Sequence, residues 1–173
     1  MAYCDHFFSP EMRMVDATIP ASIIAHAILS TAEATIGRIL QFTAYIDLRA
    51  KLPTVGYIVE LDGELGMYNI NGTDIRLCVN HRGNLLGPNS ALARHQVLEV
   101  LKSQHPNIQR NIDMNKMCLP TISIVEHGTF ADCRHWKVKT TGISLTQVKI
   151  PVVLFDAELL EWLLKRTVHE VVA

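Results

Sequence analysis

A short segment in the C-terminal half contains residue types that could bind zinc. His127, Cys133 and His135 lie close together, with Glu126 and Asp132 beside them. Imidazole and thiolate are preferred zinc ligands, and a hairpin between strands near 125 and 135 would bring these three residues together. Neither a fourth ligand nor paired short ligand spacings are evident. We therefore predict no metal or cofactor, and these three are the candidate ligands if a metal binds.

The same cysteine could instead act as a nucleophile, with His127 or His135 as its base. That chemistry needs a positioned base and a lowered thiol pKa, to which Arg134 could contribute. The chain has no G-x-S-x-G, P-loop, G-x-G-x-x-G or complete H-E-x-x-H motif. A metal- or Cys/His-dependent enzyme is therefore the third hypothesis for function, and binding without catalysis is preferred.

A second candidate site is basic. On a strand over 135–140, His135, Lys137 and Lys139 would share one face, because side chains alternate along a strand. Arg134 precedes this run, and Lys149 would lie on the adjacent strand. Such a face at 134–149 could bind the phosphates of a nucleic acid or an acidic protein. Few aromatic residues accompany it and the overall charge is not basic, so we favour a solvated face or a protein partner over nucleic acid.

The C-terminal segment, which would position these residues, is predicted to be a buried strand followed by an amphipathic helix. The strand is expected over Gln147–Phe155, at a sheet edge because Pro151 cannot donate a ladder bond. Asp156 is the expected N-cap of a helix over Ala157–Val171. Trp162 falls at the edge of the polar face of that helix. It could contact a partner, although a tryptophan packed over its own domain is the more common arrangement.

The N-terminal half begins with residues 1–15, which we predict to be an irregular arm before a domain over 16–173. A buried helix is expected from a cap at Asp16 or Thr18 to Gly37. Residues 39–48 alternate as in a half-buried strand but also fit a continuing helix, and strand is preferred.

An antiparallel meander is then indicated by Asp62-Gly63 and Asn71-Gly72, which suit type I′ turns. Its strands would be 57–61, 65–70 and 74–79. A helix beginning at Asn89 or Ser90 would end near His105, followed by a polar connection over 106–118. Three more strands are expected, at 121–126, 135–140 and 147–155, with turns at 127–129 and 141–142.

These elements predict an α+β, two-layer domain with antiparallel meander sheets and three helices. The order is one helix, three or four strands, a helix, three strands and a helix. This order is similar to that of class I secretion chaperones and profilin-like sensor domains. The resemblance is one of topology and implies nothing about function.

Composition, charge and cysteine content give further information on partners and location. Hydrophobic residues make up 49% of the chain and charged residues only 19%, which suggests that a partner or second subunit covers some surface. The net charge is −1, but residues 100–155 carry seven basic and three acidic residues, a local charge of +4. Four scattered cysteines and the absence of a signal-peptide pattern indicate a reducing, cytoplasmic location without a membrane span.

The sequence therefore predicts a non-enzymatic protein-interaction module, expected to be homodimeric. Adaptor, chaperone and inhibitor roles stay open. Its candidate binding residues are Arg134, Lys137, Lys139, Lys149 and Trp162. The expected partner is a protein, and an acidic one would suit these cations. Nucleic-acid binding through the face at 134–149 is the alternative.

Overall fold

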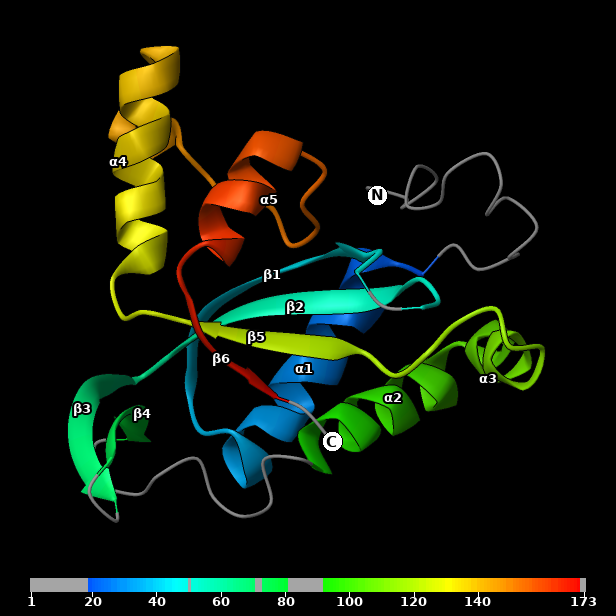
Figure 1. The fold of residues 1–173 in the computed structure, drawn as a ribbon. Coiled ribbons are helices and arrows are strands. Elements are labelled where there is room, and N and C mark those ends of the chain that lie inside the picture. The colour runs from blue at the N-terminus through cyan, green and yellow to red at the C-terminus, as the bar shows by residue number, and fades with distance from the viewer. Residues whose placement is uncertain (1–18, 50, 71–72, 81–91, 172–173) are drawn as a thin grey trace.

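Four strands form one open, mixed sheet at the centre of the fold (Figure 1). The computed structural model describes residues 19–49, 51–70, 73–80 and 92–171. The strands are β1 (Ile39–Asp47), β2 (Thr54–Leu61), β5 (Thr121–Val125) and β6 (Thr167–Val171), in the spatial order β1-β2-β5-β6. β1 and β6 run antiparallel to their neighbours, whereas β2 and β5 are parallel. A separate antiparallel pair consists of β3 (Gly63–Ile70) and β4 (Thr73–Asn80).

Five α-helices in the described chain cover both faces of this sheet. α1 (Ala21–Thr35) and α2 (Ala93–Gln104) lie on one face, and α3 (Pro106–Asp113) follows α2. α4 (Thr129–Thr141) and α5 (Ala157–Leu164) lie on the other face, joined through a 3₁₀ turn, η3 (Leu145–Gln147). The fold is α+β, but it has three layers, not the two predicted from the sequence.

Alternate residues of β2 contribute to two separate cores, because successive side chains of a strand point to opposite faces. Tyr57 and Val59 pack with α1 and α2, while Ile58 packs with α4 and α5. All eight residues of β2 are buried. Such complete burial is typical of a central strand covered on both sides.

Tyr45 of β1 lies flat over β2, and Gly56 makes room for it. Tyr45 is paired with Gly56 across the two strands, and a Cβ atom on Gly56 would come 2.4 Å from the ring carbon Cζ. No real Cβ contact is that short, so a side chain at position 56 would displace the ring. Glycine is therefore needed at this point of β2.

The predicted meander is wrong at its first connection. β2 pairs with β1 and β5, and β3 pairs with β4 alone, so Asp62-Gly63 does not close a hairpin between β2 and β3. The β3–β4 pair confirms the two strands expected around Asn71-Gly72, although the turn residues themselves lie outside the described chain. The sheet is mixed because the chain crosses over between the parallel strands β2 and β5.

The number of helices differs from the prediction at two places. The expected polar connection over 106–118 contains α3, which begins with Pro106 at a position where the missing N–H costs little. The expected strand over 135–140 is instead part of α4. These two segments account for five helices where three were predicted.

The C-terminal segment was also predicted incorrectly in part. The Asp156 cap is confirmed, since its Oδ1 accepts from Leu159 N at 3.1 Å. However, the helix ends at Leu164 and the chain continues as β6, which pairs with β5. The expected strand Gln147–Phe155 is instead an irregular segment that follows η3 and forms one bridge to β1, between Ala44 and Val153. That contact is at a sheet edge, as Pro151 indicated.

Predictions for the N-terminal half agree better with the structure. α1 and β1 confirm the helix and the preferred strand, and Gly37 has a left-handed φ of 98° just after α1. The proposed caps Asp16, Thr18, Asn89 and Ser90 lie outside the described residues, as does the predicted arm over 1–15. The division into an arm and one domain stays a prediction.

We expect Gly56→Ala to destabilise the protein by about 1–3 kcal/mol, because the new methyl group overlaps the Tyr45 ring. Urea unfolding followed by circular dichroism measures this loss. The control is Gly56→Ala in a Tyr45→Leu background, where the smaller side chain should relieve most of the penalty. An equal penalty in both backgrounds would contradict this explanation.

Candidate functional site

The residues predicted to form a basic strand face lie on helix α4 and the connection after it. Because a helix turns by about 100° per residue, Lys137 and Lys139 are about 200° apart around α4 and do not share a face. The predicted strand over 135–140, and the shared face that it would give these residues, are therefore wrong. Gly128 and Gly142 precede and follow the helix with left-handed φ values of 86° and 71°. The two expected turns thus become the two ends of one helix.

Glu60 of β2 anchors the start of α4. Its carboxylate is buried and accepts hydrogen bonds from Gly128 N at 2.8 Å and Phe130 N at 2.9 Å. A carboxylate is favourable here, because the first turn of a helix has unpaired N–H groups and a partial positive charge. Phe130 and Cys133 then pack in the core with α5. A residue distant in sequence thus determines where α4 begins.

The four candidate cations have different surroundings. Arg134 Nη1 donates to Gln41 Oε1 at 2.8 Å, and Lys137 Nζ lies 3.4 Å from Asp156 Oδ2. Lys139 and Lys149 are exposed and form no ion pair within the described chain. Two of these cations therefore hold α4 against neighbouring elements, and two are available to a partner.

Trp162 of α5 is part of an aromatic stack on its own domain. The ring centroids of Trp162 and Trp136 lie 5.8 Å apart. The Arg166 guanidinium forms a cation–π contact with Trp162, 3.3 Å from the centroid of that ring. Both tryptophans are only partly exposed. The stack joins α5 to α4, so the ring already has a role in packing.

The candidate metal ligands and nucleophile, His127, Cys133 and His135, do not form a common site in the described residues. Cys133 is fully buried, while His127 and His135 are exposed at the start and on the surface of α4. His127 Nδ1 lies 3.7 Å from Glu60 Oε1. No group of three or more His, Cys, Asp or Glu side chains in the described residues is arranged to hold a metal. Burial raises the pKa of the Cys133 thiol to about 11, despite Lys137 and Arg134 nearby, which opposes thiolate chemistry.

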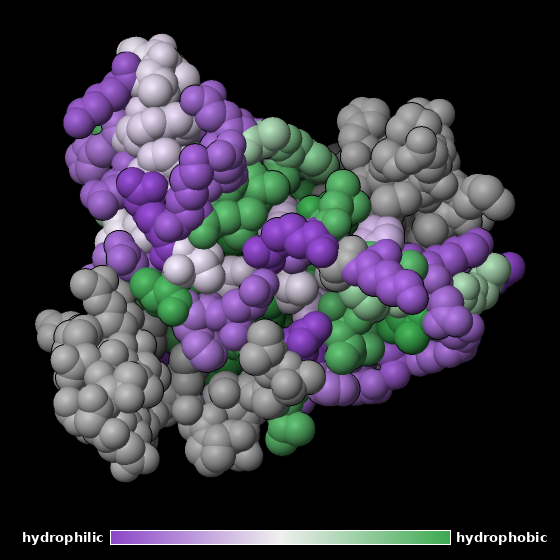
Figure 2. Space-filling view, viewed as in Figure 1, coloured by the Kyte–Doolittle hydropathy of each residue, from purple (hydrophilic) through white to green (hydrophobic). Residues whose placement is uncertain are grey.

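We define the cationic segment as residues 134–155, which carry four basic residues and no acidic residue. α4 stands out from the sheet in Figure 1, and residues 139–147 are all exposed. The connection from α4 to α5 also exposes large apolar side chains, namely Ile143, Leu145, Val152 and Phe155. Figure 2 shows hydrophilic residues over α4 beside hydrophobic residues over α5. Exposed apolar side chains flanked by cations are typical of a surface that contacts another protein.

A buried polar network lies at the other end of the same face of the sheet. Asp47 is 1% exposed, and its carboxylate accepts from Arg49 Nε at 2.9 Å and Nη2 at 2.7 Å. Thr121 of β5 donates to the same carboxylate at 2.6 Å, and the Tyr45 hydroxyl does so at 3.2 Å. Arg49 Nη2 also contacts Glu170 of β6 at 3.0 Å. The network therefore connects β1 with β5 and β6.

The network fixes the charge states of its members. Burial alone would raise the pKa of Asp47, but the hydrogen bonds from Arg49 and Thr121 outweigh it and lower the pKa to about 2. Burial, with the nearby Asp47 charge, raises the pKa of Tyr45 to about 12. Asp47 is thus ionised and Tyr45 neutral at neutral pH.

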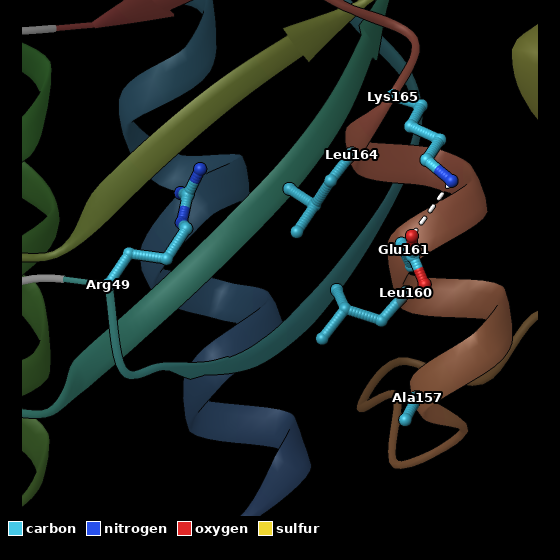
Figure 3. A pocket seen from close by; sticks show the side chains of 6 residues that line it. All are labelled: Arg49, Ala157, Leu160, Glu161, Leu164 and Lys165. Carbon is cyan, nitrogen blue, oxygen red and sulfur yellow. Dashed lines mark ion pairs between the residues drawn. The ribbon is translucent and has the colours of Figure 1, made fainter.

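An open groove of about 360 Å³ lies between Arg49 and α5. Its lining residues are Arg49, Ala157, Leu160, Glu161, Leu164 and Lys165. Figure 3 shows Leu160 and Leu164 reaching from α5 toward Arg49, and the Glu161–Lys165 ion pair, 2.8 Å long, on the same helix. Mostly apolar walls with one oriented cation suit an amphipathic ligand.

The sequence analysis did not identify the polar network around Asp47 and Arg49. Asp47 fell on the polar side of the alternating pattern in 39–48, which is expected to face water. In the structure that side is covered too, because α4 and α5 form a third layer. The signal that could have revealed it is the Asp-x-Arg spacing at 47–49, where one acidic and one basic side chain follow a buried strand.

No protein-family model matches the chain, and no curated protein is similar to it in sequence. Among solved structures, the fold is similar to GH3.15 acyl acid amido synthetase, with a TM-score of 0.66 and 16% identity. That match covers 95% of this chain and 26% of the synthetase chain. AtGH3.15 acyl acid amido synthetase in complex with 2,4-DB gives a TM-score of 0.57 at 17% identity, over 86% of this chain and 23% of the other. The chain thus spans about a quarter of the synthetase, and identities this low show the fold alone.

We expect the stability of the protein to fall on acidification through the protonation of Asp47. Its pKa in the folded state is lower than in the unfolded state, so its contribution of about 2 kcal/mol is complete above ~pH 4 and is lost as the pH falls toward ~2. Asp47→Asn should remove this part of the pH dependence in urea unfolding curves. Asp113→Asn, at an exposed site on α3, is the control and should follow the wild type. An unchanged acid profile in Asp47→Asn would refute the role of the pair.

We expect iodoacetamide at neutral pH to leave Cys133 largely unmodified in the folded protein, because the thiol is buried and its pKa is raised. Peptide mass spectrometry after timed alkylation measures the rate. The same reaction in urea is the reference, where Cys133 should react at least ~100-fold faster. Equal rates in both conditions would restore the nucleophile hypothesis.

Proposed function

We propose that this domain acts by docking onto another protein through the cationic segment, without catalysing a reaction itself. The observation that carries the proposal is the exposed stretch 139–147, which carries Lys139 and the apolar Ile143 and Leu145 and is followed by the exposed Lys149, after a helix that stands out from the sheet. An acidic partner surface with an apolar centre would complement it.

The comparison with the synthetase supports a docking role. There, a similar fold makes up about a quarter of a longer protein, so it lies beside other protein structure in the same chain. By analogy, we propose that this domain is one module of a larger assembly, whose remaining parts are either linked to it or bind it. On this proposal, any chemistry of an amido synthetase would require those parts.

The preferred partner differs from a second copy of this chain. In a two-fold symmetric dimer formed through the cationic segment, the same cations would face each other and repel. A homodimer therefore stays a prediction from the sequence, and would need another surface.

Nucleic-acid binding has less support from the structure than from the sequence pattern. The alternative depended on a flat row of cations along a strand, and α4 separates Lys137 from Lys139 around a helix. Arg134 and Lys137 also contact Gln41 and Asp156. No helix in the described chain is long and apolar enough to cross a membrane.

The test uses a photo-crosslinking amino acid placed at Leu145, in cells that contain the natural partners. We expect Leu145 to crosslink to a defined protein, because its side chain is 43% exposed within the cationic segment. Lys139→Glu with Lys149→Glu should lower the crosslink yield at least ~10-fold through lost charge complementarity.

Two controls make this result specific. A crosslinker at Leu92, also exposed but before α2, should not capture the same protein. The exposed pair Lys51→Glu and Arg110→Glu makes the same change in net charge elsewhere and should leave the yield unchanged. Loss of the crosslink in both charge variants, or in neither, would overturn the proposal.

A further inference from the structure

The Arg49 guanidinium is held in one orientation at the edge of the groove. Asp47 binds its Nε and Nη2 atoms side by side, and Asp47 Oδ1 also accepts from the Arg49 backbone N at 2.9 Å. All the side-chain hydrogen bonds of Arg49 are made by Nε and Nη2, so Nη1 makes none within the described chain. The Arg49 side chain is 48% exposed. Arg49 lines the groove, so this arrangement leaves one N–H donor group of an oriented guanidinium unused at the groove edge.

The second carboxylate on Arg49 is held much less firmly than the first. Glu170 is 43% exposed and makes one contact, to Nη2 at 3.0 Å, while Asp47 is buried and binds through two oxygens. Exposed ion pairs contribute little to stability, because water solvates both charges well. Another carboxylate could therefore take the place of Glu170 without disturbing the Asp47 pair.

The apolar side of the groove is suited to a ring or a short chain. Ala157, Leu160 and Leu164 line it from α5, opposite Arg49 (Figure 3). The remaining charges, Glu161 and Lys165, neutralise each other at 2.8 Å. A volume of about 360 Å³ lies within the ~300–1,000 Å³ range of small-molecule sites.

We propose that this groove binds a monocarboxylic acid with an apolar ring or chain, whose carboxylate replaces Glu170 at Arg49 while its apolar part lies on Leu160 and Leu164. The planar guanidinium can offer a carboxylate Nη1 and the second N–H of Nη2, which Glu170 now shares with the Tyr45 hydroxyl at 2.8 Å. A phosphate would bring more negative charge close to Asp47 and Glu170, so a singly charged acid is preferred. This site is separate from the cationic segment and does not depend on the proposed docking function.

The charges around Arg49 limit the affinity. Asp47 already neutralises the guanidinium, so the ligand gains hydrogen bonds and apolar contact more than net charge attraction. For a ligand of about twelve heavy atoms in an open groove, we expect a dissociation constant on the order of 1 mM. Such binding is measurable by nuclear magnetic resonance.

The test titrates the ¹⁵N-labelled full chain with 4-phenylbutyrate and follows amide chemical shifts. The neutral control is 4-phenylbutan-1-ol, which keeps the ring and chain but lacks the carboxylate. We expect the acid to shift amides near Arg49 and α5, and to bind at least ~5-fold more tightly than the alcohol. Equal binding of both compounds, or no saturable shift with the acid at 10 times the expected dissociation constant, roughly 10 mM, would overturn the proposal.

Two variants change affinity in opposite directions. Arg49→Gln should weaken binding of the acid at least ~10-fold, whereas Lys51→Gln, an exposed cation outside the groove, should not. Glu170→Gln removes the competing carboxylate from an exposed position and should tighten binding roughly 2- to 5-fold. Because this last change leaves the Asp47 pair intact, it is informative even if Arg49→Gln unfolds. Unchanged or weaker binding in Glu170→Gln would refute replacement of Glu170 by the ligand.

Discussion

The bidentate ion pair between Asp47 and Arg49 is the interaction on which one end of the sheet depends. A buried carboxylate is costly unless its charge is paired and its oxygens accept hydrogen bonds, and here Arg49 and Thr121 meet both conditions. The pair joins β1 to β5 through Thr121, and to β6 through Glu170. It also holds Arg49 at the groove, so the same contacts that order the strands create the candidate ligand site.

A second constraint, from Glu60, positions the opposite end of this face. Its carboxylate replaces a local N-cap for α4, whose own preceding residue is glycine and supplies no side-chain oxygen. From that anchor α4 leads into the exposed connection with Lys139, Ile143 and Leu145. The two acidic residues Asp47 and Glu60 thus organise two different surfaces, the groove and the cationic segment, on one face of one sheet.

The two proposed sites suit different ligands for physical reasons. The groove is small and open and its cation is already paired, which favours a small molecule that exchanges with a surface carboxylate. The cationic segment protrudes and contains no acidic residue, so its charge is not neutralised internally and acts over a wider surface. A macromolecular partner uses such a surface better than a small ligand does.

Elements whose pattern is local could be predicted from the order of the residues. The strand at 39–48, the Asp156 cap and the strand predicted at 121–126 were recovered, because their signals lie in neighbouring residues. Tertiary structure decided the rest. Residues 135–139 alternate like a strand, but the Glu60 cap and the packing of Phe130 and Cys133 make the segment helical. Residues 167–171 continue a helical stripe, yet the open edge of β5 offers ladder hydrogen bonds that only the folded sheet provides. Arg49 and Asp47 became a site for the same reason, since their partners Thr121 and Glu170 are distant in sequence and meet only when β5 and β6 join the sheet.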